Sequence, residues 1–486
     1  MVYRGFMHFR FKPLPTAVAL IAAALSTIAP AQVPRPADPS APVPAPSLAP
    51  PPAAAPLIPI PRLSSAQTAF LTKWVKSVDA QGIGRTVSGD QSLSENALIE
   101  AVLDRAHALH NGRVAPADFL SIWALRPAPY DPRPGLARAV AEDRLQQWAD
   151  EQAPPYAGYD GLRQGLQAYR RIQDAGGWPK LSAGAGESAI RQRLAIEDKT
   201  GAPGETLAAA IQRAQRRYGL KPSGVLDAAT LAALNVPVES RIAAIMANME
   251  RWRWMPRDMP VNRVQVNIAA AVLTVFEGDR PIMSMRAVTG RPGNETPMLV
   301  SSIHSIVVNP PWNVPTSIAR KELLPQGRQT LIRKGYRFIK TPDGGERLQQ
   351  APGPANSLGR LKFDFDNPFA VYLHDTPARG KFASYDRLAS HGCIRLEKPI
   401  PLAELMLGGN PGSTGDVQTL IDGEKTQRLA LSRQVAVYLL YWTAFAGNNG
   451  VMNFRADPYG WDKLLAAKIE ASGRSVQSTN IASREP

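Results

Sequence analysis

The sequence predicts an α+β protein of several domains, helical in its first half and mostly β in its second. Apolar residues recur every three to four positions between about 64 and 250, which is the interval of a helix. From about 261 the interval changes to two, the period of a strand. The 486 residues suffice for roughly three domains. Because 44% of them are hydrophobic and 20% are charged, the composition excludes wholesale disorder.

Residues 1–31 have the pattern of a secretory signal. Basic residues and no acidic ones stand among the first twelve, and an apolar run follows at 16–28. That run is too short to span about 30 Å of hydrocarbon, and the small residues at 29–31 suit a signal peptidase. A lipoprotein is excluded, because this segment has no cysteine to carry the lipid. We therefore expect a periplasmic or cell-envelope protein, with an uncleaved signal as the alternative that would attach it to the membrane.

Residues 32–63 predict a linker. Twelve prolines stand between positions 34 and 61. This composition is typical of an extended, semi-rigid spacer.

Residues 64–185 predict a helical scaffold domain. His107 and His110 share one face of its second helix, but no further ligand pattern accompanies them, so a surface or core role is favoured over half a metal site. The apolar spacing indicates helices at 66–78, 96–110, 136–148 and 161–172.

Residues 186–250 predict a small module of three helices. Gly219 suits the C-terminal end of one helix, and Asp227 suits the N-cap of the next, which runs through Leu234. The turn at 221–224 separates these two helices.

Residues 251–471 predict a mostly β domain. Val264, Val266 and Ile268 alternate with polar residues, and Gly278-Asp279 suits the turn of a hairpin. We expect a disordered polar tail at 472–486. Further strands are predicted at 303–308, 369–373 and 417–421.

The net charge is +15, from 56 basic and 41 acidic residues. Such a balance attracts substrates that carry carboxylates, within the limits of salt screening. Nucleic-acid binding is the other interpretation of a basic chain. The export signal and the lack of a recognised binding motif argue against it.

Cys393 is the only cysteine of the chain. A single cysteine excludes an intrachain disulfide and a site of several thiolates on zinc. In an exported protein it is either a small buried hydrophobe or a residue kept for its thiolate.

The residues around Cys393 favour the thiolate. His391 and Arg395 flank it within two positions, and Gly392 allows another group to approach the backbone closely. His374 lies nineteen positions upstream, after an apolar stretch. A cysteine and a histidine suffice for nucleophilic acyl transfer, with the neighbouring backbone N–H groups as an oxyanion hole.

A metal site is the alternative, with His374, His391 and Cys393 as ligands. The sequence has neither a second cysteine nor a pair of histidines four positions apart, so this reading is disfavoured and we expect no metal or other cofactor.

His374 followed by Ser390-His391-Gly392-Cys393-Ile394-Arg395 closely resembles the catalytic signature of the L,D-transpeptidase family. The resemblance covers roughly residues 64–470 and points to the large, murein-modifying branch. Residues 215–231 resemble the small peptidoglycan-binding module, although Ala214 and Ser223 depart from its usual pattern, which leaves a scaffolding role open. The further matching segments are 176–179, 309–315, 372–377 and 454–462.

The resemblance implies a periplasmic acyltransferase of cell-wall biogenesis and cell shape. Cys393 would attack the carbonyl at the L-centre of the third stem residue, D-Ala would leave, and an amine of a second stem would resolve the thioester into a 3→3 cross-link. His374 would move the protons, oriented by the backbone carbonyl of Asp375. A carbapenem would acylate Cys393.

The resemblance also implies supporting roles. Ser390, His391 and Gly392 would support the oxyanion site. Arg395 would support the loop or bind a substrate carboxylate. Trp312 and Tyr372 would line the cleft beneath a cap at about 312–367.

Two other functions remain open from the sequence. The same site could serve an L,D-carboxypeptidase or an endopeptidase that cleaves cross-links, because the choice between water and amine depends on the shape of the cap. A wall-binding scaffold without activity is the third possibility. The acceptor, a stem or an envelope protein, is not specified by the sequence.

Overall fold

The computed structural model describes residues 58–83, 93–408 and 417–482, with side chains of the last helix up to Ser472. The predicted signal at 1–31 and most of the predicted linker lie outside the described residues. Within the described part, no helix combines the length and the apolar character needed to cross a bilayer. Residues from Ile58 onward form one compact unit.

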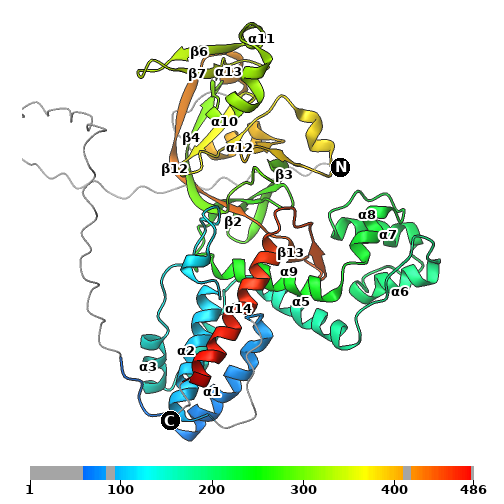
Figure 1. Cartoon of the computed structure of the whole chain (residues 1–486), viewed down its shortest axis with the longest axis vertical. Helices are drawn as coiled ribbons and strands as arrows, with labels where there is room; N and C mark the ends of the chain where they lie inside the picture. The colour runs from blue at the N-terminus through cyan, green and yellow to red at the C-terminus, as the bar shows by residue number, and fades with distance from the viewer. Residues whose placement is uncertain (1–57, 84–92, 409–416, 483–486) are drawn as a thin grey trace, which may run out of the picture. The chain divides into compact units, whose positions relative to one another are not determined.

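The first part of this unit is helical, as predicted (Figure 1). The helix expected at 136–148 is two helices, because Asp143 adopts a φ of +52° between them. Apolar side chains of α1 to α4 form a core of their own, which includes Leu71, Leu98 and Trp148. The helices are α1 (Ser65–Val78), α2 (Glu95–Asn111), α3 (Arg133–Ala141), α4 (Leu145–Asp150) and α5 (Ala157–Asp174), with single helical turns at Asp79–Gln81 and Pro116–Asp118.

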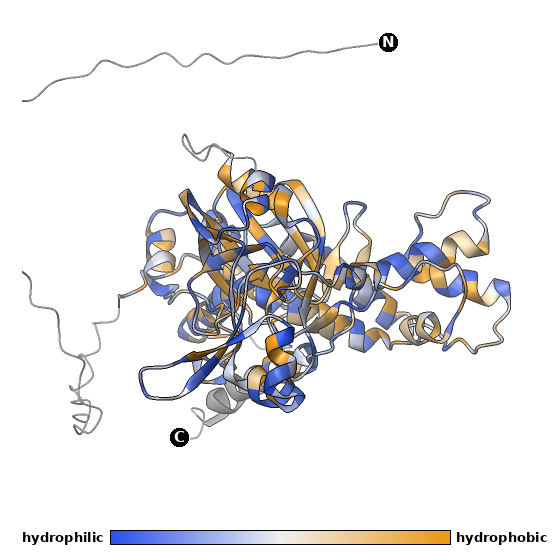
Figure 2. Cartoon of the chain, turned by 90° about the horizontal axis from the view of Figure 1, so that it is seen from above, coloured by the Kyte–Doolittle hydropathy of each residue, from blue (hydrophilic) through white to orange (hydrophobic). Residues whose placement is uncertain are grey.

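The next three helices have the caps that the sequence predicts. Gly219 follows the end of α7 with a φ of +68°, and Asp227 Oδ1 accepts the Thr230 backbone N–H at 2.7 Å at the start of α8. Figure 2 shows hydrophilic and hydrophobic residues alternating around these helices, as expected when one face is buried. The three are α6 (Glu187–Glu197), α7 (Leu207–Arg217) and α8 (Ala228–Leu234).

Helix α9 (Val238–Arg253) joins the helical half to the sheet half. Buried Glu250 accepts the backbone N–H groups of Arg113 and Val114 at 2.5 and 3.0 Å. The next residue, Arg251, donates to Asp462 at 2.6 Å. The predicted boundary at 250 therefore falls inside a helix that binds both halves.

The second half contains a nine-stranded sheet in the order β10-β3-β11-β9-β8-β4-β12-β1-β2. Strand β2 also pairs with β3, so the sheet closes on itself. Gly278 turns the β2–β3 hairpin with a φ of +60°, as predicted. The strands are β1 (Asn262–Asn267), β2 (Val272–Glu277), β3 (Arg280–Gly290), β4 (Leu299–Val308), β8 (Leu361–Phe365), β9 (Leu373–His374), β10 (Leu388–Ser390), β11 (Ile394–Leu396) and β12 (Gln427–Leu440).

The cap is a small subdomain with its own three-stranded sheet, β5-β7-β6, and its own core around Leu331 and Tyr336. The prediction that it extends to 367 is wrong, because β8 at Leu361–Phe365 is a strand of the main sheet. Its elements are β5 (Trp312–Asn313), α10 (Thr316–Ile318), turns η3 (Ala319–Leu323) and η4 (Leu324–Gln326), α11 (Arg328–Arg333), β6 (Tyr336–Lys340) and β7 (Glu346–Gln350).

Two predicted strands differ in the structure. Residues 417–421 lie in a helix, α13 (Val417–Asp422), because Val417 and Ile421 are buried one helical turn apart. Of residues 369–373 only Leu373 is in a strand. Ala370 has a φ of +53°, and the Asn367 side chain binds the backbone of the segment.

The predicted disordered tail is also a helix for most of its length. Helix α14 (Trp461–Ala482) buries Leu465 and Ile469 against the core, and a helix that is anchored in this way extends at little cost. Ser472 donates to the backbone oxygen of Arg113 at 2.9 Å. The remaining elements are α12 (Pro399–Leu407), β13 (Ala444–Ala446) and β14 (Met452–Phe454).

Candidate active site

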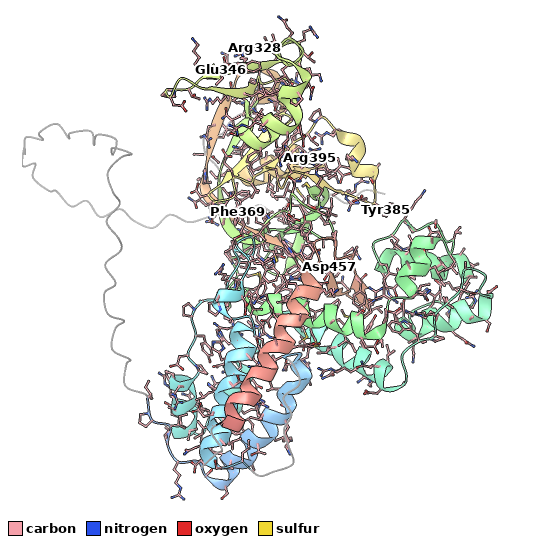
Figure 3. All side chains as sticks on the ribbon, viewed as in Figure 1. Arg328, Glu346, Phe369, Tyr385, Arg395 and Asp457 are labelled. Atoms are coloured by element: carbon pink, nitrogen blue, oxygen red, sulfur yellow. The ribbon has the colours of Figure 1, made fainter. Side chains whose placement is uncertain are left out.

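His374 lies in a row of facing residues that crosses three strands. On β8, Lys362 is opposite His374, and on β11, Arg395 is opposite it. Residues that are opposite each other in a sheet present their side chains to the same face. The imidazole therefore has a cation on either side. Figure 3 labels Arg395 at this place in the sheet.

The ring of His374 is held as a neutral base. Its Nδ1 donates to the backbone oxygen of Asp375 at 2.5 Å, and its side chain is buried. Burial, and then the charge of Arg395, lowers the pKa of His374 to about 3. With the proton on Nδ1, the basic nitrogen is Nε2.

Cys393 follows β10 and precedes β11, in a loop that hydrogen bonds fix. Gly392 has a φ of +112°, a conformation that favours glycine, and its carbonyl oxygen accepts from Thr296 Oγ1 at 2.7 Å. Buried Ser390 donates from Oγ to the Cys393 oxygen at 2.5 Å and accepts from the Gly392 N–H at 3.1 Å. The Gly392 amide is thus occupied, and the Cys393 amide is the better candidate for an oxyanion donor.

Burial raises the pKa of the Cys393 thiol above its ordinary value. Hydrogen bonding from the backbone and hydroxyl of Tyr372 opposes this rise in the pKa, as do the charges of Lys362 and Arg395. At neutral pH the thiol is therefore protonated, and it needs a base to become a nucleophile.

Tyr372 connects the nucleophile to the cap. Its ring centroid is 5.7 Å from that of His374, and the Trp312 side chain hydrogen-bonds to its hydroxyl. Burial raises the pKa of Tyr372, so the hydroxyl keeps its proton and can donate it. The two predicted lining residues thus meet at the site, one from β5 of the cap and one beside β9.

His391 is turned toward the cap. Its Nε2 lies 2.6 Å from Oε1 of Glu322 and 3.1 Å from Nη2 of Arg291. The hydrogen bond from His391 lowers the pKa of Glu322. The side chain of His391 therefore contacts a cap carboxylate, whereas the resemblance implied a place in the oxyanion site.

Arg395 brings a charge without a carboxylate partner among the residues that the structure describes. Its Nε is buried and has no hydrogen-bond partner there. Burial lowers the pKa of Arg395, and the proximity of Cys393 opposes that change. A half-buried guanidinium in this state can receive an anionic group of a ligand.

Sequence reasoning missed Lys362, Glu322 and Arg291. Their positions depend on strand register and on how the cap folds back, and no local motif marks them. In the described ranges, no three or more side chains of the kinds that bind metals form a cluster.

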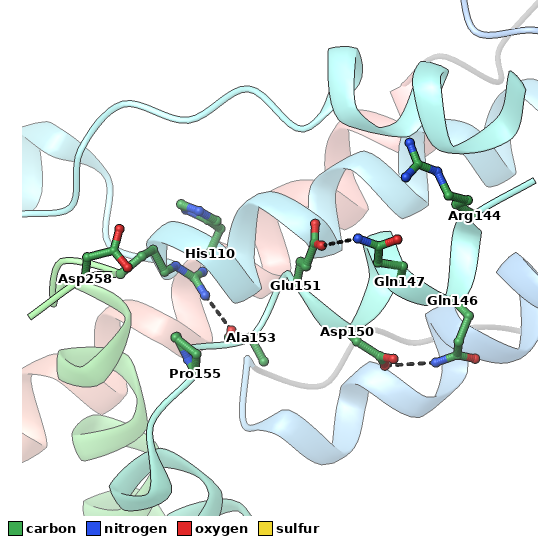
Figure 4. Close-up of a pocket in the computed structure, with 10 residues that line it drawn as sticks. His110, Arg144, Gln146, Gln147, Asp150, Glu151, Ala153, Pro155 and Asp258 are labelled. Carbon is green, nitrogen blue, oxygen red and sulfur yellow. Dashed lines mark hydrogen bonds between the residues drawn. The ribbon is translucent and has the colours of Figure 1, made fainter. Parts of the chain in front are cut away.

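A cavity of about 800 Å³ lies in the helical half, away from this site (Figure 4). Two pairs form among its lining side chains: Gln146 donates to Asp150 at 2.9 Å and Gln147 donates to Glu151 at 3.0 Å. His110 lines it, stacked on Tyr130 at 3.6 Å, and burial lowers the pKa of His110 to about 4. These contacts give His110 a structural role.

Three families match the chain. Residues 261–417 match a family described as "L,D-transpeptidase catalytic domain", residues 190–234 match "Putative peptidoglycan binding domain", and residues 64–166 match "Scaffold domain".

A curated protein of Haemophilus influenzae, named "Putative L,D-transpeptidase", is 30% identical over 247 residues, which are 47% of this chain and 50% of that protein. The chain thus spans about half the length of the curated relative that it matches.

The solved structures that match the chain include two mycobacterial proteins. An L,D-transpeptidase from Mycobacterium smegmatis is 14% identical, with 37% of this chain and 58% of that chain covered and a TM-score of 0.21. L,D-transpeptidase 3 from Mycobacterium tuberculosis is 15% identical, with 37% and 61% covered and a TM-score of 0.20. TM-scores this low carry no structural argument, so these two structures add nothing to the family matches.

Proposed function

We propose that this chain forms 3→3 cross-links between peptidoglycan stem peptides, with Cys393 as nucleophile, because residues 261–417 match the L,D-transpeptidase catalytic domain. The observation that carries the proposal is the neutral His374, fixed by Asp375 and set one strand away from the segment that holds Cys393.

The first half of the reaction makes a thioester. Nε2 of His374 takes the proton of the Cys393 thiol, and the sulfur attacks the carbonyl carbon at the L-centre of the third stem residue. The imidazolium gives that proton to the amine of the terminal D-Ala, which leaves as the peptide bond breaks.

The second half transfers the acyl group. His374 takes a proton from the amine of an acceptor stem as its nitrogen attacks the thioester. The C–S bond then breaks, and the proton returns to the sulfur of Cys393. Protons and electrons balance over the cycle. His374 alone serves as the base and the acid in both halves.

The charges around the site support this order of events. A raised thiol pKa and a lowered imidazole pKa mean that both groups rest uncharged. The proton therefore moves during attack. Lys362 and Arg395 favour the negative charge that then develops on sulfur and on the substrate oxygen.

Arg395 is the proposed receptor for a stem carboxylate. It is half-buried, it lies beside both reacting residues, and its Nε lacks a partner in the described part of the chain. A carboxylate of the third stem residue would satisfy it.

The cap supports an amine acceptor over water. Trp312 and Glu322 both reach the site from the cap, the first at Tyr372 and the second at His391. We expect such coverage to limit the access of water to the thioester. The carboxypeptidase and endopeptidase alternatives would require water to enter there.

We place this reaction in the cell envelope, where the substrate is. The matched module at 190–234 is related to peptidoglycan-binding domains, and it packs on the catalytic half through Arg455, which donates to the Arg217 oxygen at 2.8 Å. It would hold the site near its polymer.

Mass spectrometry of tetrapeptide stems incubated with the whole chain tests the proposal. We expect a cross-linked dimer lighter by one D-Ala, and none with Cys393→Ala. A product of trimmed monomers only would assign the hydrolase instead. Dimers formed by a folded Cys393→Ala protein would remove the cysteine from the mechanism.

A further inference from the structure

Lys362 lies over the residue that contacts the nucleophile. Its Nζ is 4.4 Å from the centroid of the Tyr372 ring. On the sheet it is directly opposite His374. A cation at this distance from an aromatic face is attracted by the electrons of the ring, so it restrains where the ring can lie.

The ammonium group of Lys362 is itself held by an ion pair. Asp364, two residues along β8, binds Nζ at 2.6 Å, and its other carboxylate oxygen binds Nη1 of Arg428 at 2.9 Å. Arg428 also donates to Ser305 Oγ at 2.6 Å. The side chains of Lys362 and Asp364 are only 23% and 14% exposed. Lys362 is therefore placed by a network and is not a solvated surface lysine.

Tyr372 connects Lys362 to the sulfur of Cys393. The hydroxyl and backbone amide of Tyr372 both hydrogen-bond to Cys393, and Trp312 holds the same hydroxyl from the cap side. Moving the ring would weaken the side-chain contact, and removing the ammonium would take a positive charge from the neighbourhood of the thiolate.

We propose that Lys362 is a positioning residue of the nucleophile: it holds Tyr372 so that the phenol donates to Cys393, and it adds a charge that favours the thiolate. The inference deepens the proposed function, because it assumes that the thiolate of Cys393 is the reacting group. It assigns to Lys362 no contact with substrate.

The test is the pH profile of iodoacetamide alkylation of the whole chain, followed by intact mass. Cys393 is the only thiol, so the profile reports one site. With Lys362→Gln we expect the midpoint to rise by about half a pH unit or more, which is about a threefold loss of rate below the midpoint. Lys362→Arg should restore the profile, since it keeps the charge over the ring.

Lys340→Gln is the matched control, because it removes the same charge from an exposed position on β6 of the cap. It should leave the profile unchanged. Circular dichroism melting confirms that each variant is folded, and Lys362→Met replaces Lys362→Gln if the latter does not fold. An unchanged profile in a folded Lys362 variant overturns the proposal.

Tyr372→Phe separates positioning from charge alone. If Lys362 acts through the phenol, Lys362→Gln should have a clearly smaller effect in the Tyr372→Phe background. An equal effect in both backgrounds overturns the positioning role. Alkylation needs no stem peptide, so it tests this inference independently of the proposed function. If the parent chain does not cross-link stems but Lys362→Gln still shifts the alkylation profile, the proposed function is rejected and this inference is not.

Discussion

Glu322 in the cap lies 2.6 Å from Nε2 of His391, two residues before the nucleophile. Their side chains are 42% and 25% exposed. Arg291 joins them at 3.4 Å from the carboxylate. Through this contact the cap is fastened to the loop that carries Cys393.

Glu322→Gln should loosen the cap. The pair is partly exposed, so we expect it to contribute about 0.2–1 kcal/mol, or up to about a fivefold slower acylation of Cys393 by a carbapenem at low salt. Mass spectrometry follows the adduct over time. The difference from the parent protein should shrink at high salt, because ions screen the pair. A salt-independent effect would mean that Glu322 acts in another way.

His374→Ala should slow acylation by roughly two to four orders of magnitude, as expected for loss of a general base. Rates of adduct formation give the comparison, and Cys393 alkylation at high pH shows that the thiol is still accessible. A variant within tenfold of the parent would reject His374 as the base.

His374 also makes the fold sensitive to acid. Its pKa is about 3 in the folded state and near 6.5 when exposed in the unfolded chain, so the unfolded state binds the proton more tightly. The stability contribution is complete above about pH 6.5 and is lost as the pH falls toward 3. Urea unfolding at several pH values should show this slope, and it should be shallower in His374→Gln. Equal slopes would argue against burial of a neutral ring.

Arg395→Gln should weaken substrate binding more than it weakens thiol chemistry. A charge-assisted hydrogen bond contributes about 1.5–3 kcal/mol, so KM for stem peptides should rise by about tenfold or more. The matched control uses the same stems with the carboxylate of the third residue amidated. For these stems, Arg395→Gln should raise KM little above that of the parent protein. A normal KM with a reduced kcat would instead assign Arg395 to the loop.

Chelators should leave activity unchanged, because the proposed chemistry uses only Cys393 and His374. Incubation with EDTA before the stem-peptide assay checks this. Inactivation that zinc restores would revive the metal hypothesis.

The local motifs carried most of the successful prediction. The resemblance to L,D-transpeptidases and the α+β architecture are confirmed by the family matches and the structure. The Asp227 cap and the Gly278 turn are confirmed too, because they depend on neighbouring residues only. The roles of Cys393 and His374 stay predictions.

What failed depended on distant partners. Lys362 is opposite His374 only because β8 and β9 pair in one register, and no local pattern states that register. Glu322 meets His391 across 69 residues of sequence. Residues 417–421 form a short apolar run, for which strand and helix cannot be told apart by period alone.

Helix α9 has a practical consequence for dissecting the protein. Glu250 and Arg251, side by side in sequence, are tied to opposite halves of the chain, the first to the Arg113 backbone and the second to Asp462. A cut between them would keep each of these two contacts within one piece, but it would interrupt the helix and separate the buried ion pair between Glu250 and Arg253 at 2.8 Å. The two halves should therefore melt in a single calorimetric transition, and expression of the catalytic half alone should begin upstream of Val238.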